Sequence, residues 1–119
     1  MRWEILFHDE FEQEFDKFGT IMRKRLVVMA GLLERHGPNL GRPYADHLHG
    51  SKHTNMKELR FEADGGVWRV AFVFDPERKA ILLIAGDKRG INQKRFYKHL
   101  IREADERFDR HLAKQKRKI

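Results

Sequence analysis

The first third of the chain combines a short aromatic run with longer stretches at helical spacing. Residues 3–7 mix aromatic and aliphatic side chains over a strand's length, which predicts a first β-strand. Asp9 and Glu12 have the spacing of a capping box and predict the start of a helix. The apolar stripe of this helix consists of Phe11, Phe15 and Phe18. Gly19 ends it, and a second helix is predicted over 20–36, so the two helices form a hairpin or a kinked pair. The second stripe consists of Met22, Leu26, Met29 and Leu33.

A long polar segment separates these helices from three predicted strands. Residues 37–55 are rich in Gly and Pro and predict a loop, and so long a loop in a small domain is usually functional. From Met56 the period of the apolar positions changes to that of a strand, which predicts strands over 56–61, 67–74 and 79–85. Because their connections have hairpin length, the three strands should be antiparallel neighbours.

The last predicted element is a long helix that begins after an Asn92 cap. Its apolar stripe consists of Phe96, Leu100, Ala104, Phe108 and Leu112. The basic run that follows has no such stripe, so we expect residues 1–113 to form one domain and residues 114–119 a basic tail that frays. The order β-α-α-β-β-β-α predicts an α+β domain, a small antiparallel sheet with its helices packed on one face.

Composition and charge narrow the classes of function. The chain contains no cysteine, which excludes disulfides, a thiol nucleophile and Cys-ligated zinc. It has neither a signal peptide nor an apolar run of membrane-spanning length, so we expect a cytoplasmic protein with no membrane partner. Residues 1–35 carry six basic against seven acidic residues, a net charge of −1, whereas residues 36–119 carry nineteen against eleven, a net charge of +8. This asymmetry favours a polyanionic partner such as nucleic acid, with simple solubility as the alternative.

Several cations are predicted to converge on the sheet face that the helices leave open. Arg69 lies within an apolar strand, on the face opposite Trp68, and a charge there is unfavourable unless it is paired or solvated. Arg60 shares a strand face with Glu58, and it either joins this site or only pairs with a nearby carboxylate. The other candidate cations are Lys57, which needs a β-bulge to face the site, Lys88 and Arg89. The 46–55 loop is expected to form the rim.

The histidines of the long loop favour proton transfer over metal binding. His47, His49 and His53 are close in sequence, but they lie on a loop, and no H-E-x-x-H motif or cysteine accompanies them. We therefore expect no metal and no other cofactor. His53 beside a cationic site is a candidate for proton transfer or substrate binding, because its charge changes near neutral pH.

Lys, Arg and His without a metal or a carboxylate pair suit the cleavage of RNA by its own 2′-hydroxyl group. The substrate carries the nucleophile, so the protein must align it, stabilise the charge of the phosphorane and transfer protons. Arginine forks match phosphate oxygens. Phe96 or Tyr97, early in the last helix, offers a surface on which an unpaired base can stack. Core packing is the alternative for each, and it is favoured for Phe96, which starts the apolar stripe.

Three stretches together resemble a known family: LGRPYADHLHGSKHTNMKELRF, WRVAFVFDPERKAILLIAGDKRG and KRFYKHLIREADERF. They are similar to the phage-derived Gp49-like, HigB-type branch of the RelE/ParE toxin superfamily, over residues 40–112. The resemblance implies a RelE-like fold and a toxin of a type II toxin–antitoxin system, held by its antitoxin in a hetero-oligomer. Characterised RelE and HigB relatives cut mRNA without a metal, typically in the ribosomal A site. The resemblance therefore implies an endoribonuclease with mRNA and the ribosome as partners.

The resemblance also implies roles for individual residues. The basic residue before the Leu-Arg motif falls on Lys57, the Arg of that motif on Arg60, and the phosphate-binding Arg of the next strand on Arg69. Two assignments stay open, namely Lys88 or Arg89 for the basic position that closes the last strand, and Phe96 or Tyr97 for the base-stacking aromatic.

Two considerations keep other functions open. ParE relatives inhibit DNA gyrase and cleave no RNA, and an accessory nucleic-acid-binding protein without toxicity is a further alternative. In many toxins of the group the catalytic residues lie near a truncated C-terminus, whereas here a long helix and a basic tail follow Lys88. If that helix covers the open face, the site is occluded or rearranged.

Overall fold

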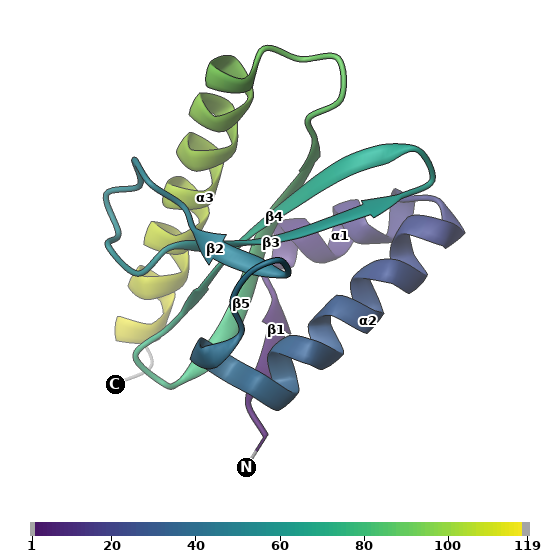
Figure 1. Cartoon of the computed structure of the whole chain (residues 1–119). Helices are drawn as coiled ribbons and strands as arrows, with labels where there is room; N and C mark the ends of the chain where they lie inside the picture. Colours follow the sequence, from purple (N-terminus) through teal and green to yellow (C-terminus); the bar gives the residue numbers. More distant parts are fainter. Residues whose placement is uncertain (1, 118–119) are drawn as a thin grey trace.

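A computed structural model describes residues 2–117 and has the predicted α+β architecture (Figure 1). Helix α1 (Asp9–Lys17) and helix α2 (Thr20–His36) lie where the helical spacing predicts them. The last helix, α3 (Gln93–Lys116), continues through the first part of the segment that was expected to fray. Residues 118–119, the end of that predicted tail, lie outside the described residues.

Five strands of the described chain form one sheet in the order β1-β5-β4-β3-β2. The strands predicted after the long loop are β3 (Lys57–Ala63), β4 (Gly66–Phe74) and β5 (Lys79–Asp87), and they pair antiparallel as expected. β1 (Glu4–Phe7) pairs with β5 in parallel, so the sheet is mixed rather than purely antiparallel. β2 (Ala45–His47) lies within the predicted loop and pairs antiparallel with β3, and no sequence pattern predicts it.

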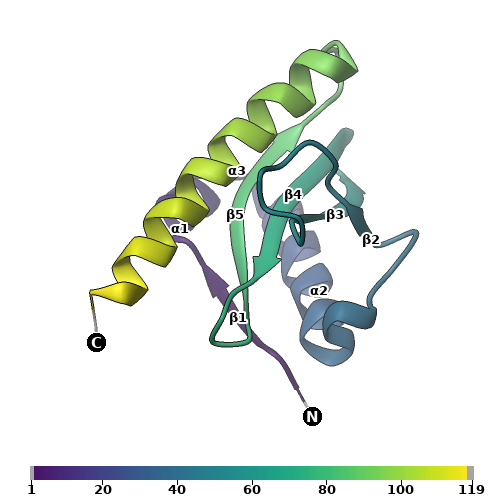
Figure 2. The ribbon, with the colours of Figure 1, turned by 90° about the vertical axis from the view of Figure 1, so that its left-hand side faces the viewer.

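The helices cover both faces of the sheet, which corrects the expectation that they pack on one face. Figures 1 and 2 show α1 and α2 on one side of the sheet and α3 on the other. On the α1/α2 face, Phe72 of β4 belongs to the same apolar cluster as Phe11 and Leu26 of the helices. On the α3 face, Ala71 and Leu83 of the sheet belong to a second cluster with the stripe of α3. The face that was expected to be open is therefore largely covered.

Buried polar contacts fix the second half of α3 to the rest of the fold. Arg107 is 4% exposed and donates to the Leu83 carbonyl at 2.8 Å and to the Glu14 carboxylate of α1 at 2.9 Å. His111 lies 2.9 Å from the buried carboxylate of Asp75, in the turn between β4 and β5. Because removing one partner of a buried charge pair is strongly unfavourable, these contacts hold the helix in one position.

Candidate functional site

The candidate site lies where β3 and β4 run side by side, on the face that α3 covers. Arg60 and Arg69 are direct neighbours in the β3–β4 register. Glu58 lies two residues before Arg60 and therefore points to the same face. Leu59 and Phe61, at the alternate positions, point into the α1/α2 core. Strand alternation alone thus brings one carboxylate and two guanidinium groups together.

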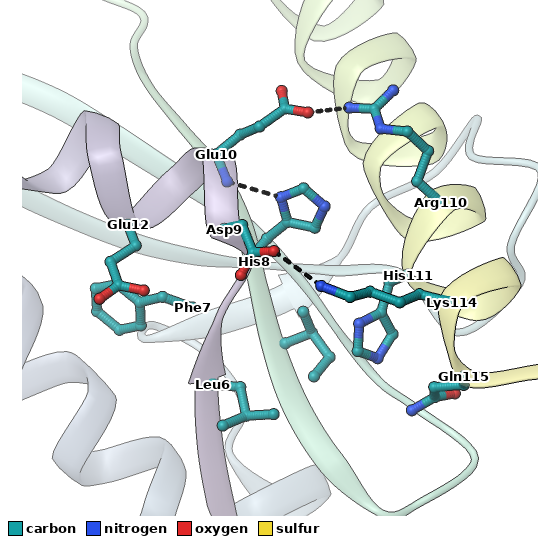
Figure 3. A pocket seen from close by; sticks show the side chains of 11 residues that line it. Leu6, Phe7, His8, Asp9, Glu10, Glu12, Arg110, His111, Lys114 and Gln115 are labelled. Carbon is teal, nitrogen blue, oxygen red and sulfur yellow. Dashed lines mark hydrogen bonds and ion pairs between the residues drawn. The ribbon is translucent and has the colours of Figure 1, made fainter. Parts of the chain in front are cut away.

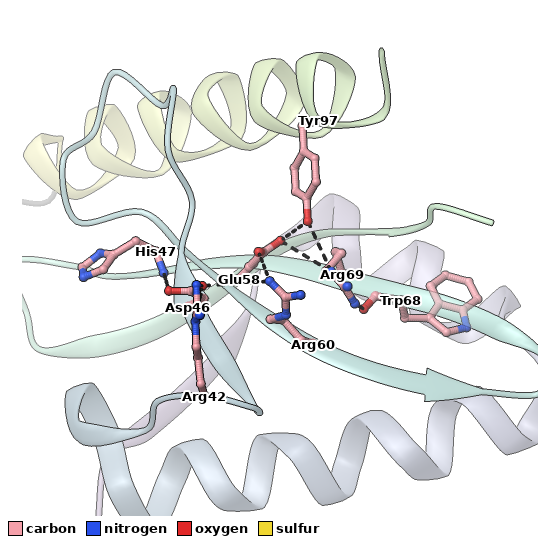
Figure 4. A network of polar contacts seen from close by, with 8 residues as sticks. All are labelled: Arg42, Asp46, His47, Glu58, Arg60, Trp68, Arg69 and Tyr97. Atoms are coloured by element: carbon pink, nitrogen blue, oxygen red, sulfur yellow. Dashed lines mark hydrogen bonds and ion pairs between the residues drawn. The ribbon is translucent and has the colours of Figure 1, made fainter. Parts of the chain in front are cut away.

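Glu58 is the centre of a buried polar network (Figure 4). Its carboxylate accepts a hydrogen bond from the Tyr97 hydroxyl of α3 at 2.9 Å and one from Arg60 at 3.2 Å. Arg69 Nε lies 3.9 Å from the same carboxylate and donates to the Tyr97 oxygen at 3.3 Å. A further hydrogen bond, 2.9 Å long, joins Arg69 to the Trp68 carbonyl. These groups satisfy one another, which is the condition under which buried charges are tolerated.

Burial changes the proton affinity of the groups in this network. Desolvation raises the pKa of Glu58 above its ordinary value, and the hydrogen bond from Tyr97 and the charges of Arg60 and Arg69 only partly oppose this shift. At the end of β5, burial lowers the pKa of Lys88, and the positive charges of the two arginines lower it further. Glu58 therefore takes up a proton more readily than an exposed carboxylate, and Lys88 releases one more readily than an exposed lysine.

An open groove of about 580 Å³ lies beside the network and is lined by four arginines. They come from different parts of the fold: Arg25 from α2, Arg42 from the segment before β2, Arg60 from β3 and Arg69 from β4. Asp46 of β2 binds Arg42 at 2.9 Å, and its carboxylate lies 4.0 Å from Arg60. Four guanidinium groups around one hollow attract an anion with several oxygens, such as a phosphodiester.

Lys57 does not join this site. It pairs with Phe72 in the sheet register, on the α1/α2 face, and its Nζ donates to the Pro38 carbonyl of the 3₁₀ turn η1 (Gly37–Asn39) at 3.3 Å. The irregularity of the sheet lies between β4 and β5, at Ala71 and Phe72, and the β3–β4 register is continuous. The bulge that would turn Lys57 toward the arginines is therefore absent from β3.

The two cations that end β5 point in different directions. Lys88 Nζ lies 6.0 Å from the centre of the Tyr97 ring, beside the network. Arg89 donates to the Gly65 carbonyl at 2.6 Å and pairs with Asp87 at 3.4 Å, so it faces the β3–β4 turn. Of the two, the structure brings Lys88 to the site.

The two aromatic candidates of α3 also differ in their surroundings. Phe96 is 7% exposed, belongs to the apolar cluster under α3 and lies so close to Gly86 that a Cβ there would be 2.8 Å from its ring. Tyr97 is half-buried, and its hydroxyl reaches Glu58. The structure therefore places Tyr97 at the site and Phe96 in the core.

His53 fastens the long loop to the second half of α3. Its Nε2 lies 2.9 Å from an Asp109 oxygen, and its ring meets the Phe108 ring edge-on at 4.7 Å. Ser51 donates to Asp105 of the same helix at 2.5 Å. At 1.5 Å per residue, these carboxylates lie about 12 Å or more along α3 from Tyr97. This part of the loop is therefore not the rim of the Glu58 site, and the structure does not bring His53 to it.

A second hollow, of about 530 Å³, lies between the start of α1 and the end of α3 (Figure 3). Its charged groups pair with one another: Arg110 donates to Glu10 at 2.5 Å, and Lys114 donates to Asp9 at 3.2 Å. The His8 ring accepts a hydrogen bond from the Glu10 N–H at 3.2 Å, and burial lowers the pKa of that histidine. These groups hold α3 against α1 and leave little uncompensated charge for a ligand.

Residues 2–117 contain no group of three or more His, Cys, Asp or Glu side chains placed to hold a metal ion. Within the same range, no helix has the length and apolar character needed to cross a membrane.

The sequence alone did not identify several residues of this site as candidates. Glu58 was considered only as an ion-pair partner of Arg60, although its parity on the strand already placed it with the arginines. Arg25 and Arg42 carry no local signal, because they reach the groove only through the packing of α2 and the segment before β2 beside β3.

Sequence comparison finds relatives over most of the chain. The family model described as phage-derived protein Gp49-like matches residues 13–109. A Mycobacterium tuberculosis protein named as a toxin, HigB3, is 50% identical over 101 residues, which cover 82% of this chain and 86% of that protein. A second protein of the same organism, named as the toxin HigB2, is 48% identical over 83 residues, which cover 69% of this chain and 41% of that protein.

Structural comparison finds a RelE-like fold. The free Escherichia coli toxin RelE, in a mutant form, matches with a TM-score of 0.65 over 90% of this chain and 98% of that one. The two sequences are 15% identical, so this likeness concerns the fold alone. The match of the family model over residues 13–109 and the 50% identical relative show that the protein belongs to the phage-derived Gp49-like family, with HigB-type relatives, and the structural likeness shows that it has the fold of RelE.

Proposed function

We propose that this chain is the toxin of a type II toxin–antitoxin system and that it cleaves mRNA on the ribosome without a metal. The HigB-type relatives support the toxin role. The observation that carries the enzymatic part is the position of Glu58, a buried carboxylate between Arg60, Arg69 and Tyr97 at the edge of an arginine-lined groove. The proposed partners are mRNA, the ribosome and an antitoxin, and the ribosomal target places the protein in the cytoplasm.

Glu58 is the general base of the proposed reaction. Its carboxylate accepts the proton of the ribose 2′-hydroxyl while the 2′-oxygen forms a bond to phosphorus. Because burial raises the pKa of Glu58, the carboxylate is a stronger base than an exposed glutamate. The Tyr97 hydroxyl, which donates to Glu58 in the free protein, turns to the substrate when the ribose takes its place.

Arg60 and Arg69 stabilise the phosphorane. Negative charge develops on the non-bridging oxygens as the new bond forms, and donors that are already oriented lower the barrier most. The guanidinium of Arg69 is held in advance by the Trp68 carbonyl and the Tyr97 hydroxyl. The Arg60 side chain is 35% exposed, so it is free to follow the phosphate into the groove.

Lys88 assists the leaving group. It donates a proton to the 5′-oxygen while the bond between phosphorus and that oxygen breaks, which yields a 2′,3′-cyclic phosphate and a 5′-hydroxyl end. Its lowered pKa makes this transfer easier near neutral pH. We assign no chemical step to Lys57, Arg89, His53 or Phe96, because each has its contacts elsewhere in the fold.

Induced expression in cells tests the proposal. Wild type should arrest growth and produce new 5′ ends within translated mRNA, whereas Glu58→Gln should lower the cleavage rate about 10²- to 10⁴-fold, the usual contribution of a general base. Arg89→Ala is the matched control, since it removes a cation next to Lys88 that points away from the site, and it should cut like wild type.

Two outcomes would contradict the proposal. Equal cleavage by Glu58→Gln and wild type would remove Glu58 as the base. Growth arrest with intact mRNA and damaged DNA would replace the ribosome by gyrase as the target, as in ParE relatives.

A further inference from the structure

The outer face of α2 is an apolar surface that no other described element covers. The inward residues of this helix are at most 2% exposed and form the core stripe Met22, Leu26, Met29 and Leu33. On the outer side, Ile21, Val27 and Val28 are 58%, 60% and 53% exposed. They are three of the five large hydrophobic side chains that are exposed in residues 2–117. Single exposed apolar residues are ordinary, but a group on one helix face indicates a binding surface.

The spacing on this face is that of a helix that packs against another helix. Ile21 and Val28 lie seven residues apart, and Gly31 follows three residues after Val28, as positions a and d do in a heptad. Gly31 lies inside α2, where glycine weakens a helix, and a Cβ at this position would meet nothing within 4 Å. Nothing in the described fold requires a glycine there, whereas the close approach of a second backbone would.

The charge of α2 indicates what kind of partner fits. The helix carries four Arg and Lys against one Glu, a net charge of +3, and Glu34 is already paired with Arg2 at 2.7 Å. Its first turn has no acidic residue, whereas α1 has three there, so α2 lacks the charge that the helix dipole favours. A second copy of this face would bring like charges together. An acidic helix would be attracted.

We propose that the face formed by Ile21, Lys24, Val27, Val28 and Gly31 is the docking surface for the antitoxin, which lays on it an α-helix with an apolar stripe and an acidic flank. The identity of this occupant rests on the proposed function.

The docking face is continuous with the candidate catalytic groove. Arg25 lines that groove and lies four residues after Ile21 and three before Val28, so it is one turn away from both along α2. Figure 4 shows α2 running beside the network of Glu58 and Arg60. The acidic flank of a docked helix therefore reaches the groove and competes there with the phosphate of the substrate, which gives a physical route to neutralisation.

Binding measurements with the antitoxin test the proposal, since a toxin of this type usually has its antitoxin encoded beside it. Calorimetric titration of that purified protein should give a dissociation constant about 30-fold higher for Val28→Glu than for wild type, as for a central interface residue. Ile91→Glu is the matched control and should bind within about twofold of wild type. Both side chains are about half exposed, at 53% and 48%, so both variants should fold, and thermal melts verify this.

Gly31→Leu separates docking from a structural role of the glycine. The new side chain has free space and a better helix propensity, so the melting temperature of the free chain should rise. Affinity for the partner should fall in the same variant, because the side chain fills the position where the partner helix approaches. A glycine with only a structural role would not give this combination.

A growth assay provides the readout in cells. Val28→Glu should arrest growth as wild type does, since Val28 takes no part in the catalytic site, but coexpression of the partner should no longer rescue it. Rescue equal to that of wild type, or unchanged affinity, would overturn the proposal. A wild-type dimer that Val28→Glu dissociates in sedimentation would assign the face to a second copy instead. A failure of the proposed function would show itself in a different measurement, as the absence of mRNA cleavage by wild type without the partner.

Discussion

The two faces of β3 and β4 share one backbone, yet one face is an apolar core and the other a polar site. Toward α1 and α2, the central positions of the two strands are apolar and at most 6% exposed: Leu59, Phe61, Val70 and Phe72. Toward α3, Glu58, Arg60 and Arg69 lie together in the register of the two strands, and the apolar Ala71 and Val73 follow further along β4. Helices cover both faces, so covering alone does not distinguish a core from a site.

The difference lies in what the covering helix contributes and in how far it reaches. Over Ala71 and Val73, which are completely buried, α3 places apolar side chains. Over Glu58 it places the Tyr97 hydroxyl, and the Arg60 side chain beyond is still 35% exposed. Partial cover of this kind desolvates the Glu58 carboxylate enough to raise its pKa and leaves the neighbouring Arg60 side chain in contact with solvent.

The largest expected effect is the loss of stability when a buried side chain of the apolar face is truncated. Phe72→Ala should lower the free energy of unfolding by about 3–5 kcal/mol, because it leaves a cavity under a completely buried ring. Arg60→Gln, on the other face of the neighbouring strand, should change stability by about 1 kcal/mol, because the Arg60 side chain is 35% exposed and Glu58 keeps its hydrogen bond from Tyr97, while it abolishes cleavage. Urea unfolding of both variants measures the contrast. Equal destabilisation would show that the polar face is a structural element rather than a site.

Local patterns were sufficient to predict most of the fold. The helices α1 and α2 and the strands of the β3–β5 meander follow from apolar spacing and turn residues. The face of the sheet on which α3 packs does not follow from the pattern of that helix alone. Ile81 to Ile84 are buried on both faces of β5, which requires cover on both sides of the sheet, and the stripe of α3 is the remaining apolar surface. β2 has only three residues and forms by pairing with a distant strand edge, so it has no local signal.

The site shows the same division between local and long-range information. Arg60 and Arg69 were predicted from their place in the strands, and the β3–β4 register makes them neighbours. For Lys57 the family resemblance and the strand parity disagreed, and the structure follows the parity. Phe96 and Tyr97 both stayed candidates for the base-stacking aromatic, although the apolar stripe of the helix favoured core packing for Phe96. The rotation of α3 about its axis, which is set by packing against the sheet, decides that Tyr97 faces Glu58.

The pH dependence of stability sharpens the contrast between the two faces. The pKa of Glu58 is raised in the folded state, so the folded chain holds this proton more tightly than the unfolded chain does. The contribution of Glu58 to stability is therefore fully present below the ordinary value of 4.5 and is lost as the pH rises through the raised pKa of the folded state.

Glu58→Gln isolates this contribution, since glutamine does not titrate. Urea unfolding of wild type and variant between pH 4 and pH 8 should show the variant gaining stability relative to wild type as the pH rises. Phe72→Leu on the apolar face should show a stability difference from wild type that is independent of pH. A constant or opposite trend for Glu58→Gln would mean that the arginines, and not burial, dominate the pKa of Glu58.

Tyr97→Phe has the smallest expected effect, and it distinguishes a positioning role of Tyr97 from a structural one. Tyr97→Phe keeps the ring and removes a single hydroxyl, so the free energy of unfolding should fall by about 1 kcal/mol. The hydrogen bond from this hydroxyl lowers the pKa of Glu58, and its loss should raise that pKa further. The acid limb of the pH profile of mRNA cleavage should therefore move to higher pH in the variant. If stability falls but the limb stays in place, Tyr97 only fastens α3 to the sheet, and the base acts independently of the helix that covers it.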